Sequence, residues 1–143
     1  SSIMNIFKKD TDYLLGSKPN MGIETPFEEN DLTSDIKRYE RTLELVRKKP
    51  EIRLWGVTNS FARAVNNRFK ILRQKNWAEE INIKTLFINS LNDKVVDPKK
   101  INIMSKRLKN SQIINFKNCE HEIFMEKDVH RNKMWNAIDE FLK

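Results

Sequence analysis

The stretch over residues 84–124 constrains the fold most, because two strand patterns within it run directly into polar loops. The first apolar run, 85–90, has the length and composition of a buried parallel strand and leads into Asp93. The second, 111–117, leads into His121, and a helical pattern separates the two runs. This order predicts two parallel strands joined by a crossover helix, and therefore an α/β fold.

The residues that follow the two strands are a candidate acid and base. Asp93 and His121 are expected at the same edge of the sheet, where catalytic groups of α/β enzymes collect. A carboxylate after one strand and an imidazole after the next can present two members of a catalytic triad. Asp97 is the alternative acid, but it precedes Pro98 and is expected to cap the helix. We favour Asp93, and we expect the other histidine, His130, on an exposed helix face.

No nucleophile accompanies this pair in the sequence. A serine elbow requires G-x-S-x-G, whereas the segment Leu15-Gly16-Ser17-Lys18-Pro19 has Leu and Pro where the glycines belong. Cys119, the single cysteine, is expected to be a packing residue, and a lone cysteine favours a reducing compartment. Because no zinc-type ligand spacing and no phosphate loop are present, the sequence predicts neither a metal nor a cofactor.

The region before the first strand has helical periodicity instead. Apolar residues recur at helical spacing over 34–49 and again over 59–74, with charged residues between them. An apolar corner that contains Trp55 joins the two predicted helices, and the second carries Phe61 and Val65 on its apolar face. The segment before them is rich in turn residues, and a closing helix is predicted after the histidine loop.

These patterns divide the chain into a loop-rich and helical region over residues 1–80 and an α/β region over 81–143. Two strands alone make a poor parallel sheet, so further strands are expected beside them, outside the 143 residues. The small number of glycines, three, also indicates that strand-to-helix turns are missing, and the first residue is not Met. We therefore expect either a piece of a longer protein or the product of a broken reading frame.

Composition limits the partners. The formal net charge of +7 allows attraction to anionic membrane surfaces. The basic runs lack interleaved aromatic residues, which argues against a nucleic-acid-binding module. No run approaches the roughly 20 apolar residues of a membrane-spanning helix, and the N-terminus has no signal-peptide pattern.

On these residues the chain resembles the C-terminal half of an α/β-hydrolase of the lysophospholipase and monoacylglycerol lipase family. The resemblance extends from about residue 30 to the end of the chain. It rests on four groups of residues: Asn30-Asp31-Leu32-Thr33-Ser34-Asp35 with Arg38-Tyr39; Pro50 and Thr58; Asn92-Asp93-Lys94-Val95-Val96; and His121-Glu122-Ile123-Phe124 with Glu126-Lys127-Asp128 and Arg131.

The resemblance implies a partial α/β-hydrolase fold in which Asp93 is the acid of the triad and His121 the base. It implies that residues 34–80 are cap helices over the acyl chain of a lysophospholipid or monoacylglycerol, with Trp55 and the apolar face of 61–72 bounding the lipid.

Phe61 and Val65 belong to the apolar face of residues 61–72. The family's serine elbow is absent, so we expect a serine ester hydrolase whose nucleophile lies in a missing N-terminal half. The chain alone is then expected to be inactive, and the location cytoplasmic, with peripheral contact at the inner face of the membrane. The alternative is a non-catalytic remnant or partner-binding fragment of such a hydrolase.

Overall fold

The computed structural model describes residues 10–15, 25–52, 56–74 and 76–143. The chain forms two compact units, which we describe separately. The helical unit comprises Ser1–Thr25 and Leu45–Lys75, and the sheet unit comprises Pro26–Glu44 and Asn76–Lys143. The segment Pro26–Glu44 thus groups with the strands, and the division of the chain at residue 80 into cap and hydrolase core stays a prediction.

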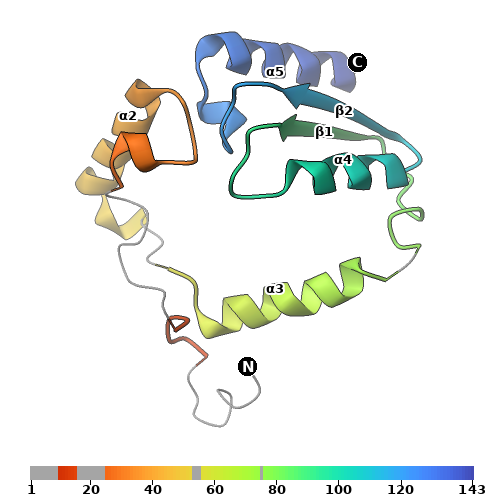
Figure 1. Cartoon of the computed structure of the whole chain (residues 1–143), viewed down its shortest axis with the longest axis horizontal. Coiled ribbons are helices and arrows are strands. Elements are labelled where there is room, and N and C mark those ends of the chain that lie inside the picture. Colours follow the sequence, from red (N-terminus) through yellow and green to blue (C-terminus); the bar gives the residue numbers. More distant parts are fainter. Residues whose placement is uncertain (1–9, 16–24, 53–55, 75) are drawn as a thin grey trace. The chain divides into compact units, whose positions relative to one another are not determined.

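The sheet unit contains both predicted strands with a helix between them and another after them (Figure 1). Its elements are η1 (Phe27–Glu29), the start of α2 (Ile36–Lys48), β1 (Thr85–Ser90), α4 (Pro98–Arg107), β2 (Ser111–Phe116), η3 (Ile123–Met125) and α5 (Asp128–Leu142). The strands pair in parallel, from Thr85 opposite Ser111 to Ser90 opposite Phe116. Because the register has no offset, both strands end at the same edge of the sheet.

The two faces of the sheet differ in chemistry. On one face Ile88 and Ile114 pack towards the core that includes Met134 of α5. Side chains alternate along a strand, so the next residues, Asn89 and Asn115, point to the opposite face. There the Asn89 side-chain amide donates to Asn115 Oδ1 (2.8 Å), and both residues bond to the amino-terminal part of α4. Figure 1 shows α4 and α5 on opposite sides of the strands.

The helical unit is built around α3 (Asn59–Leu72) and also contains η2 (Pro50–Ile52). α3 begins where Thr58 Oγ1 accepts a hydrogen bond from the Phe61 N–H (3.3 Å), as expected of an N-cap threonine. Tyr13 forms an isolated antiparallel bridge with Thr58. α3 has no buried residue, so its apolar side chains stay accessible within this unit.

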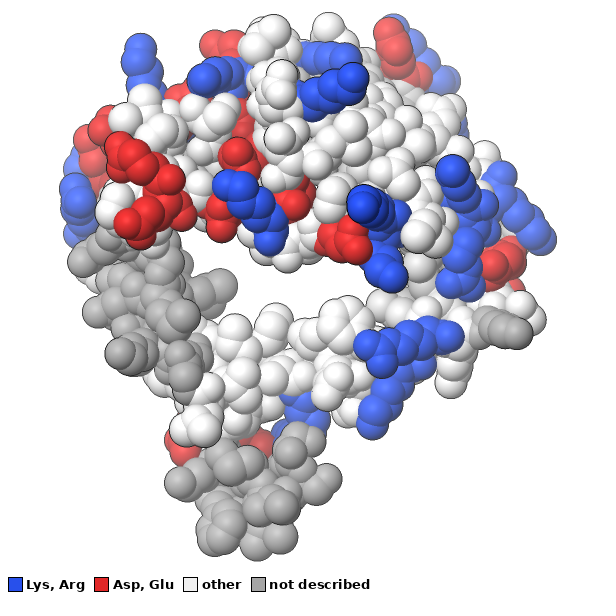
Figure 2. Space-filling view, in the orientation of Figure 1, with Lys and Arg blue, Asp and Glu red and all other residues white. Residues whose placement is uncertain are grey.

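The surface of the sheet unit carries charges of both signs (Figure 2). On the face of the sheet unit shown in Figure 2, Lys and Arg side chains are interspersed with Asp and Glu. Among the described helices, none combines the length and the apolar character that a membrane crossing requires.

Candidate active site

The loop after β1 is shaped by the carboxylate of Asp93. Asp93 Oδ1 accepts hydrogen bonds from the N–H groups of Val95 (2.8 Å) and Val96 (2.9 Å). Aspartate favours such turns because its short side chain can accept from the backbone two or three residues further on. One carboxylate oxygen therefore fixes the turn, and the other, Oδ2, remains for a partner outside the loop.

The loop after β2 is fixed by a distant part of the chain. Asn118 adopts a left-handed backbone conformation (φ 60°), which turns the chain away from the strand. The His121 N–H then donates to the Asp31 carbonyl (3.2 Å), and the Glu122 N–H donates to the Leu32 carbonyl (2.7 Å). The histidine loop is thus held along the segment that precedes α2.

The structure brings the two sequence-predicted groups together at the carboxyl ends of the adjacent strands. His121 Nδ1 lies 2.7 Å from Asp93 Oδ2. The Asp93 side chain is 4% exposed, whereas the His121 side chain is 31% exposed. With Nδ1 occupied by the carboxylate, Nε2 is the ring nitrogen left to exchange a proton with a nucleophile.

Asp93 stays ionised despite its burial. Burial by itself raises the pKa of this carboxyl group, but the hydrogen bonds from Val96, His121 and Val95 outweigh it, and the pKa is lowered below its ordinary value. A buried, ionised carboxylate next to an imidazole can hold one tautomer of the ring and stabilise the imidazolium when it forms.

Polar side chains at the strand ends tie the two loops to each other. The Ser90 hydroxyl donates to the Cys119 carbonyl (2.5 Å) and accepts from the Asn92 N–H (3.3 Å). Asn92 Oδ1 in turn accepts from the Asn118 N–H (3.1 Å). These contacts set the spacing between the loops that carry Asp93 and His121.

Ser90, Asn92 and the fully buried Glu126 had no predicted role, although Asn92 and Glu126 stand in the motifs that carry the family resemblance. The signal for the first two was the polar character of the last strand residue, Ser90, and of the loop residue Asn92 two positions later. The signal for Glu126 was a single carboxylate directly after the apolar Ile123–Met125 segment.

A pocket of about 320 Å³ opens beside the histidine. It is lined by Ile88, His121, Glu122, Ile123 and Phe124. Most of these side chains are apolar, and the imidazole is at the wall of the pocket. An apolar group bound there would lie next to the imidazole of His121.

The predicted lipid-contacting residues lie in the helical unit or outside the described residues. Trp55 is among the residues that the structure does not describe. Phe61 on α3 is 59% exposed, and Val65 is half-buried. A pocket of about 400 Å³ in this unit is lined by Asp10, Leu14, Leu15, Asn59, Ala62, Arg63 and Asn66. Neither Phe61 nor Val65 lines it, and their role in substrate binding stays a prediction.

The alternative residues have other environments. Asp97 Oδ1 accepts from the Lys99 N–H (2.9 Å) at the start of α4, as expected of a helix cap. Cys119 is fully buried. Burial, followed by the charges of Glu126 and Glu120, raises the pKa of its thiol to about 11, so little thiolate forms at neutral pH. Within the part of the chain that the structure describes, no three His, Cys, Asp or Glu residues are grouped so as to hold a metal ion.

Two solved structures are similar to this chain. A soluble variant of monoglyceride lipase from Saccharomyces cerevisiae, solved in complex with a substrate analog, matches with a TM-score of 0.60 at 18% identity, over 99% of this chain and 50% of the lipase chain. The Paleococcus ferrophilus monoacylglycerol lipase matches with a TM-score of 0.59 at 20% identity, over 72% of this chain and 39% of that one. The chain therefore has part of the α/β-hydrolase fold.

Sequence comparison agrees. A probable lysophospholipase L2 from Haemophilus influenzae is 26% identical over 141 residues, which cover 99% of this chain but 44% of that protein. The chain thus spans less than half the length of this curated relative. The family model described as serine aminopeptidase, S33, matches residues 5–128. The chain belongs to the S33 serine aminopeptidase family of serine hydrolases.

Proposed function

We propose that this chain supplies the acid and base of a serine ester hydrolase that acts on lysophospholipids or monoacylglycerols. The observation that carries the proposal is the 2.7 Å contact between His121 Nδ1 and Asp93 Oδ2 at the common edge of two parallel strands. The names of the similar proteins, a lysophospholipase and two monoacylglycerol lipases, support this substrate class.

In the proposed reaction, a serine from an N-terminal half attacks the carbonyl carbon of the ester. His121 Nε2 takes the proton from the serine hydroxyl as the new C–O bond forms. The tetrahedral intermediate then collapses, the ester C–O bond breaks, and the imidazolium returns the proton to the leaving alcohol. Water repeats both steps on the acyl-enzyme, while Asp93 keeps the imidazole oriented.

Among the described residues, no strand pairs with the side of β1 that faces away from β2, which supports the existence of a partner half. The N–H groups of Thr85 and Leu91 donate to Asn110 and Phe116, on the side of β2. Since backbone groups alternate in direction along a strand, those of Leu86 and Ile88 point away from β2. A further parallel strand would satisfy them, and an apolar strand such as β1 is typical of a strand with neighbours on both sides.

We further propose that the cap residues Trp55, Phe61 and Val65 contact the acyl chain, and that the complete protein binds anionic membrane surfaces. The exposed ring of Phe61 and the net charge of +7 support these two points. Sedimentation with anionic and with zwitterionic vesicles tests the second, and equal binding to both would contradict it.

The central test is complementation. The chain is mixed with a separately expressed N-terminal half that carries a G-x-S-x-G elbow, and hydrolysis of a nitrophenyl ester, a lysophospholipid and a monoacylglycerol is measured. We expect activity from the mixture, none from either half, and none with His121→Ala. The Ser→Ala variant of the elbow is the control.

Two other outcomes are informative. A mixture that binds but does not hydrolyse any of the three esters would favour the alternative, a non-catalytic remnant or partner-binding fragment. Hydrolysis by this chain alone, lost on His121→Ala, would contradict the need for a second half.

A further inference from the structure

A carboxylate that takes no direct part in the proposed reaction lies buried beneath the histidine loop. Glu126 follows η3 directly and is fully buried. Its Oε1 accepts from the N–H groups of Ser34 (3.0 Å) and Glu120 (2.8 Å). Its Oε2 accepts from the Ser34 hydroxyl (2.5 Å) and from the N–H of Lys127 (3.4 Å). Four donors therefore compensate for its burial.

These contacts join two segments that lie far apart in the sequence. Ser34 precedes α2, and Glu120 precedes His121 by one residue. Beside them run the hydrogen bonds from His121 to Asp31 and from Glu122 to Leu32. The hydrogen bonds between residues 31–34 and residues 120–126 form one continuous line of contacts, which we call the seam. The Glu126 carboxylate lies at one end of the seam, and His121 is one of its residues.

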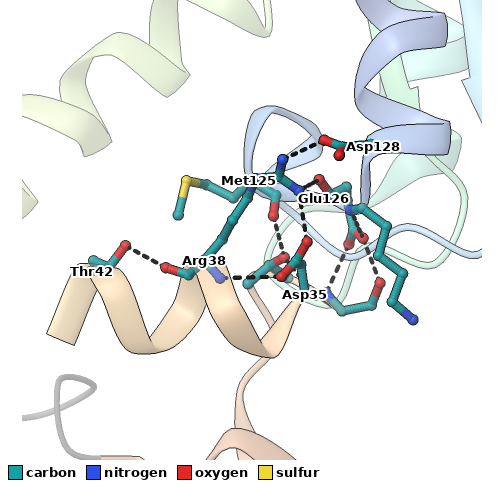
Figure 3. A network of polar contacts seen from close by, with 9 residues as sticks. Asp35, Arg38, Thr42, Met125, Glu126 and Asp128 are labelled. Carbon is teal, nitrogen blue, oxygen red and sulfur yellow. Dashed lines mark hydrogen bonds and ion pairs between the residues drawn. The ribbon is translucent and has the colours of Figure 1, made fainter. Parts of the chain in front are cut away.

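Neighbouring contacts reinforce the seam from outside (Figure 3). Arg38 Nη1 donates to Asp35 Oδ2 and to the Glu126 carbonyl, both at 2.6 Å. Its Nη2 donates to Asp128 Oδ1 (2.5 Å). The Thr33 hydroxyl donates to the Met125 carbonyl (2.7 Å). The start of α2 is thereby attached on both sides of Glu126.

We propose that Glu126 is a positioning residue for His121: its carboxylate clamps residue 34 to residue 120 and so fixes the loop that presents the imidazole to Asp93. An apolar side chain at this position would leave the N–H groups of Ser34, Glu120 and Lys127 without these acceptors. A carboxylate is the side chain that can accept from several backbone N–H groups at once, which defines the course of both segments. The catalytic meaning of this inference rests on the proposed function, whereas its test is independent of that function.

The test measures the His121–Asp93 contact in the chain itself. Proton NMR detects the low-field Nδ1–H resonance, and amide hydrogen exchange measures opening at His121 and Glu122. In Glu126→Ala we expect loss of the low-field resonance. We also expect exchange at these two amides to be about ten- to a hundredfold faster, as for the loss of hydrogen bonds to a buried charge.

The conservative variant is expected to rescue the contact. In Glu126→Gln the amide oxygen can replace Oε1 and accept from Ser34 and Glu120, while the NH₂ group donates to the Ser34 hydroxyl. We expect the low-field resonance to persist and exchange to stay within about threefold of wild type.

A matched control separates positioning from general destabilisation. Leu108 is buried at the end of α4, by the start of β2, whereas the histidine loop follows the end of that strand. Leu108→Ala should lower the stability of the unit and leave the low-field resonance in place. Equal loss of the resonance in Leu108→Ala and Glu126→Ala at matched stability would overturn the proposal, as would a resonance and slow exchange retained in Glu126→Ala.

If Glu126→Ala does not fold, the Ser34→Ala variant tests the proposal in its place. It removes one of the four donors, and we expect exchange at His121 to be about three- to tenfold faster; an unchanged rate would overturn the proposal. Loss of the His121 contact in Glu126→Ala, together with failed complementation, would support this inference and contradict the proposed function. Retention of the contact in Glu126→Ala, together with successful complementation, would overturn this inference and support the proposed function.

Discussion

The two loops that meet at the candidate site are held in different ways. The loop over residues 91–97 is shaped by its own sequence, since Asp93 accepts from N–H groups two and three residues away. The loop over 117–127 depends on residues about 90 positions earlier, through Asp31, Leu32 and Ser34. The acid is therefore positioned locally, and the base is positioned by tertiary contacts.

This difference has an energetic consequence. A local turn closes few residues, whereas contacts across a long stretch of chain form only when the rest of the unit is folded. We therefore expect the histidine loop to open at lower cost than the Asp93 loop, and the candidate site to lose its base before its acid. Variants in and around the two loops test that contrast.

The largest effect is expected from Asp93→Asn. The Asn side-chain oxygen still accepts from Val95 and Val96, so the loop should keep its shape, but the neutral amide no longer selects the right tautomer of His121. In the complex with the N-terminal half, we expect kcat to fall about 10⁴-fold, the loss typical of this change in Ser–His–Asp enzymes.

Asp97→Asn is the matched control for that variant. Asn is as good an N-cap as Asp, so this change should leave the ester hydrolysis rate within about threefold of wild type. A large loss of kcat in Asp97→Asn, with little loss in Asp93→Asn, would assign the acid to Asp97 instead.

The second effect concerns Cys119, a natural probe of the histidine loop. Its thiol pKa of about 11, against an ordinary value of 9.0, predicts roughly a hundredfold less thiolate in the folded chain than in the unfolded one. We expect iodoacetamide at pH 7 to label the urea-unfolded chain at least that much faster, as measured by mass spectrometry. Equal rates would show that the loop is open in the folded chain.

The third effect is a loss of stability on removing Arg38. Arg38→Ala deletes the bonds to Asp35, to the Glu126 carbonyl and to Asp128, and we expect the free energy of unfolding to fall by about 2 kcal/mol. Urea denaturation measures this, and labelling of Cys119 should become faster in the same variant.

Asp128→Ala removes only the outermost of these bonds. The Asp128 side chain is 72% exposed, so we expect less than about 1 kcal/mol from this control. If the two variants lose the same stability, the contact between Arg38 and the histidine loop contributes nothing beyond a surface ion pair.

The smallest effect is the pH dependence that Asp93 contributes. Its pKa in the folded chain lies below the ordinary value of 3.8, so the folded state binds fewer protons than the unfolded state in this range. The stabilisation is complete above the ordinary pKa and disappears as the pH falls through the lowered one. The difference in unfolding free energy between wild type and Asp93→Asn, measured by urea titration at a series of pH values, should shrink below pH 3.8.

The contradicting result would be a difference that vanishes already near neutral pH. It would show that the carboxylate contributes no stability in its ionised form, and the hydrogen bonds from Val95 and Val96 would then not explain the lowered pKa.

The strands and the starts of α3 and α4 were predicted well from the sequence, because those signals are local. The first strand, 85–90, was predicted with the bounds that it has in the structure, and the second was predicted to begin at Ser111, as it does. Asp97 caps its helix as expected. Helix ends were less well defined: α2 covers Ile36–Lys48 rather than 34–49, and α3 ends at Leu72 rather than at 74.

The rest could not be predicted, because it depends on partners that are distant in the sequence. The Ser90 hydroxyl accepts from the nearby Asn92 N–H, but its bond to the Cys119 carbonyl spans 29 residues. Glu126 reaches Ser34 across 92 residues. Neither distance leaves a periodic or spacing signal, since such signals come from geometry within one helix or strand.

Local sequence patterns predicted two parallel strands that each end in a polar loop, one with Asp93 and the other with His121. They did so because strand length, apolar continuity and turn chemistry are properties of neighbouring residues. That the two side chains meet at 2.7 Å depends on the folded unit. The physical reason is that the histidine loop takes its course from backbone and carboxylate hydrogen bonds to the segment before α2, which forms only in the folded unit.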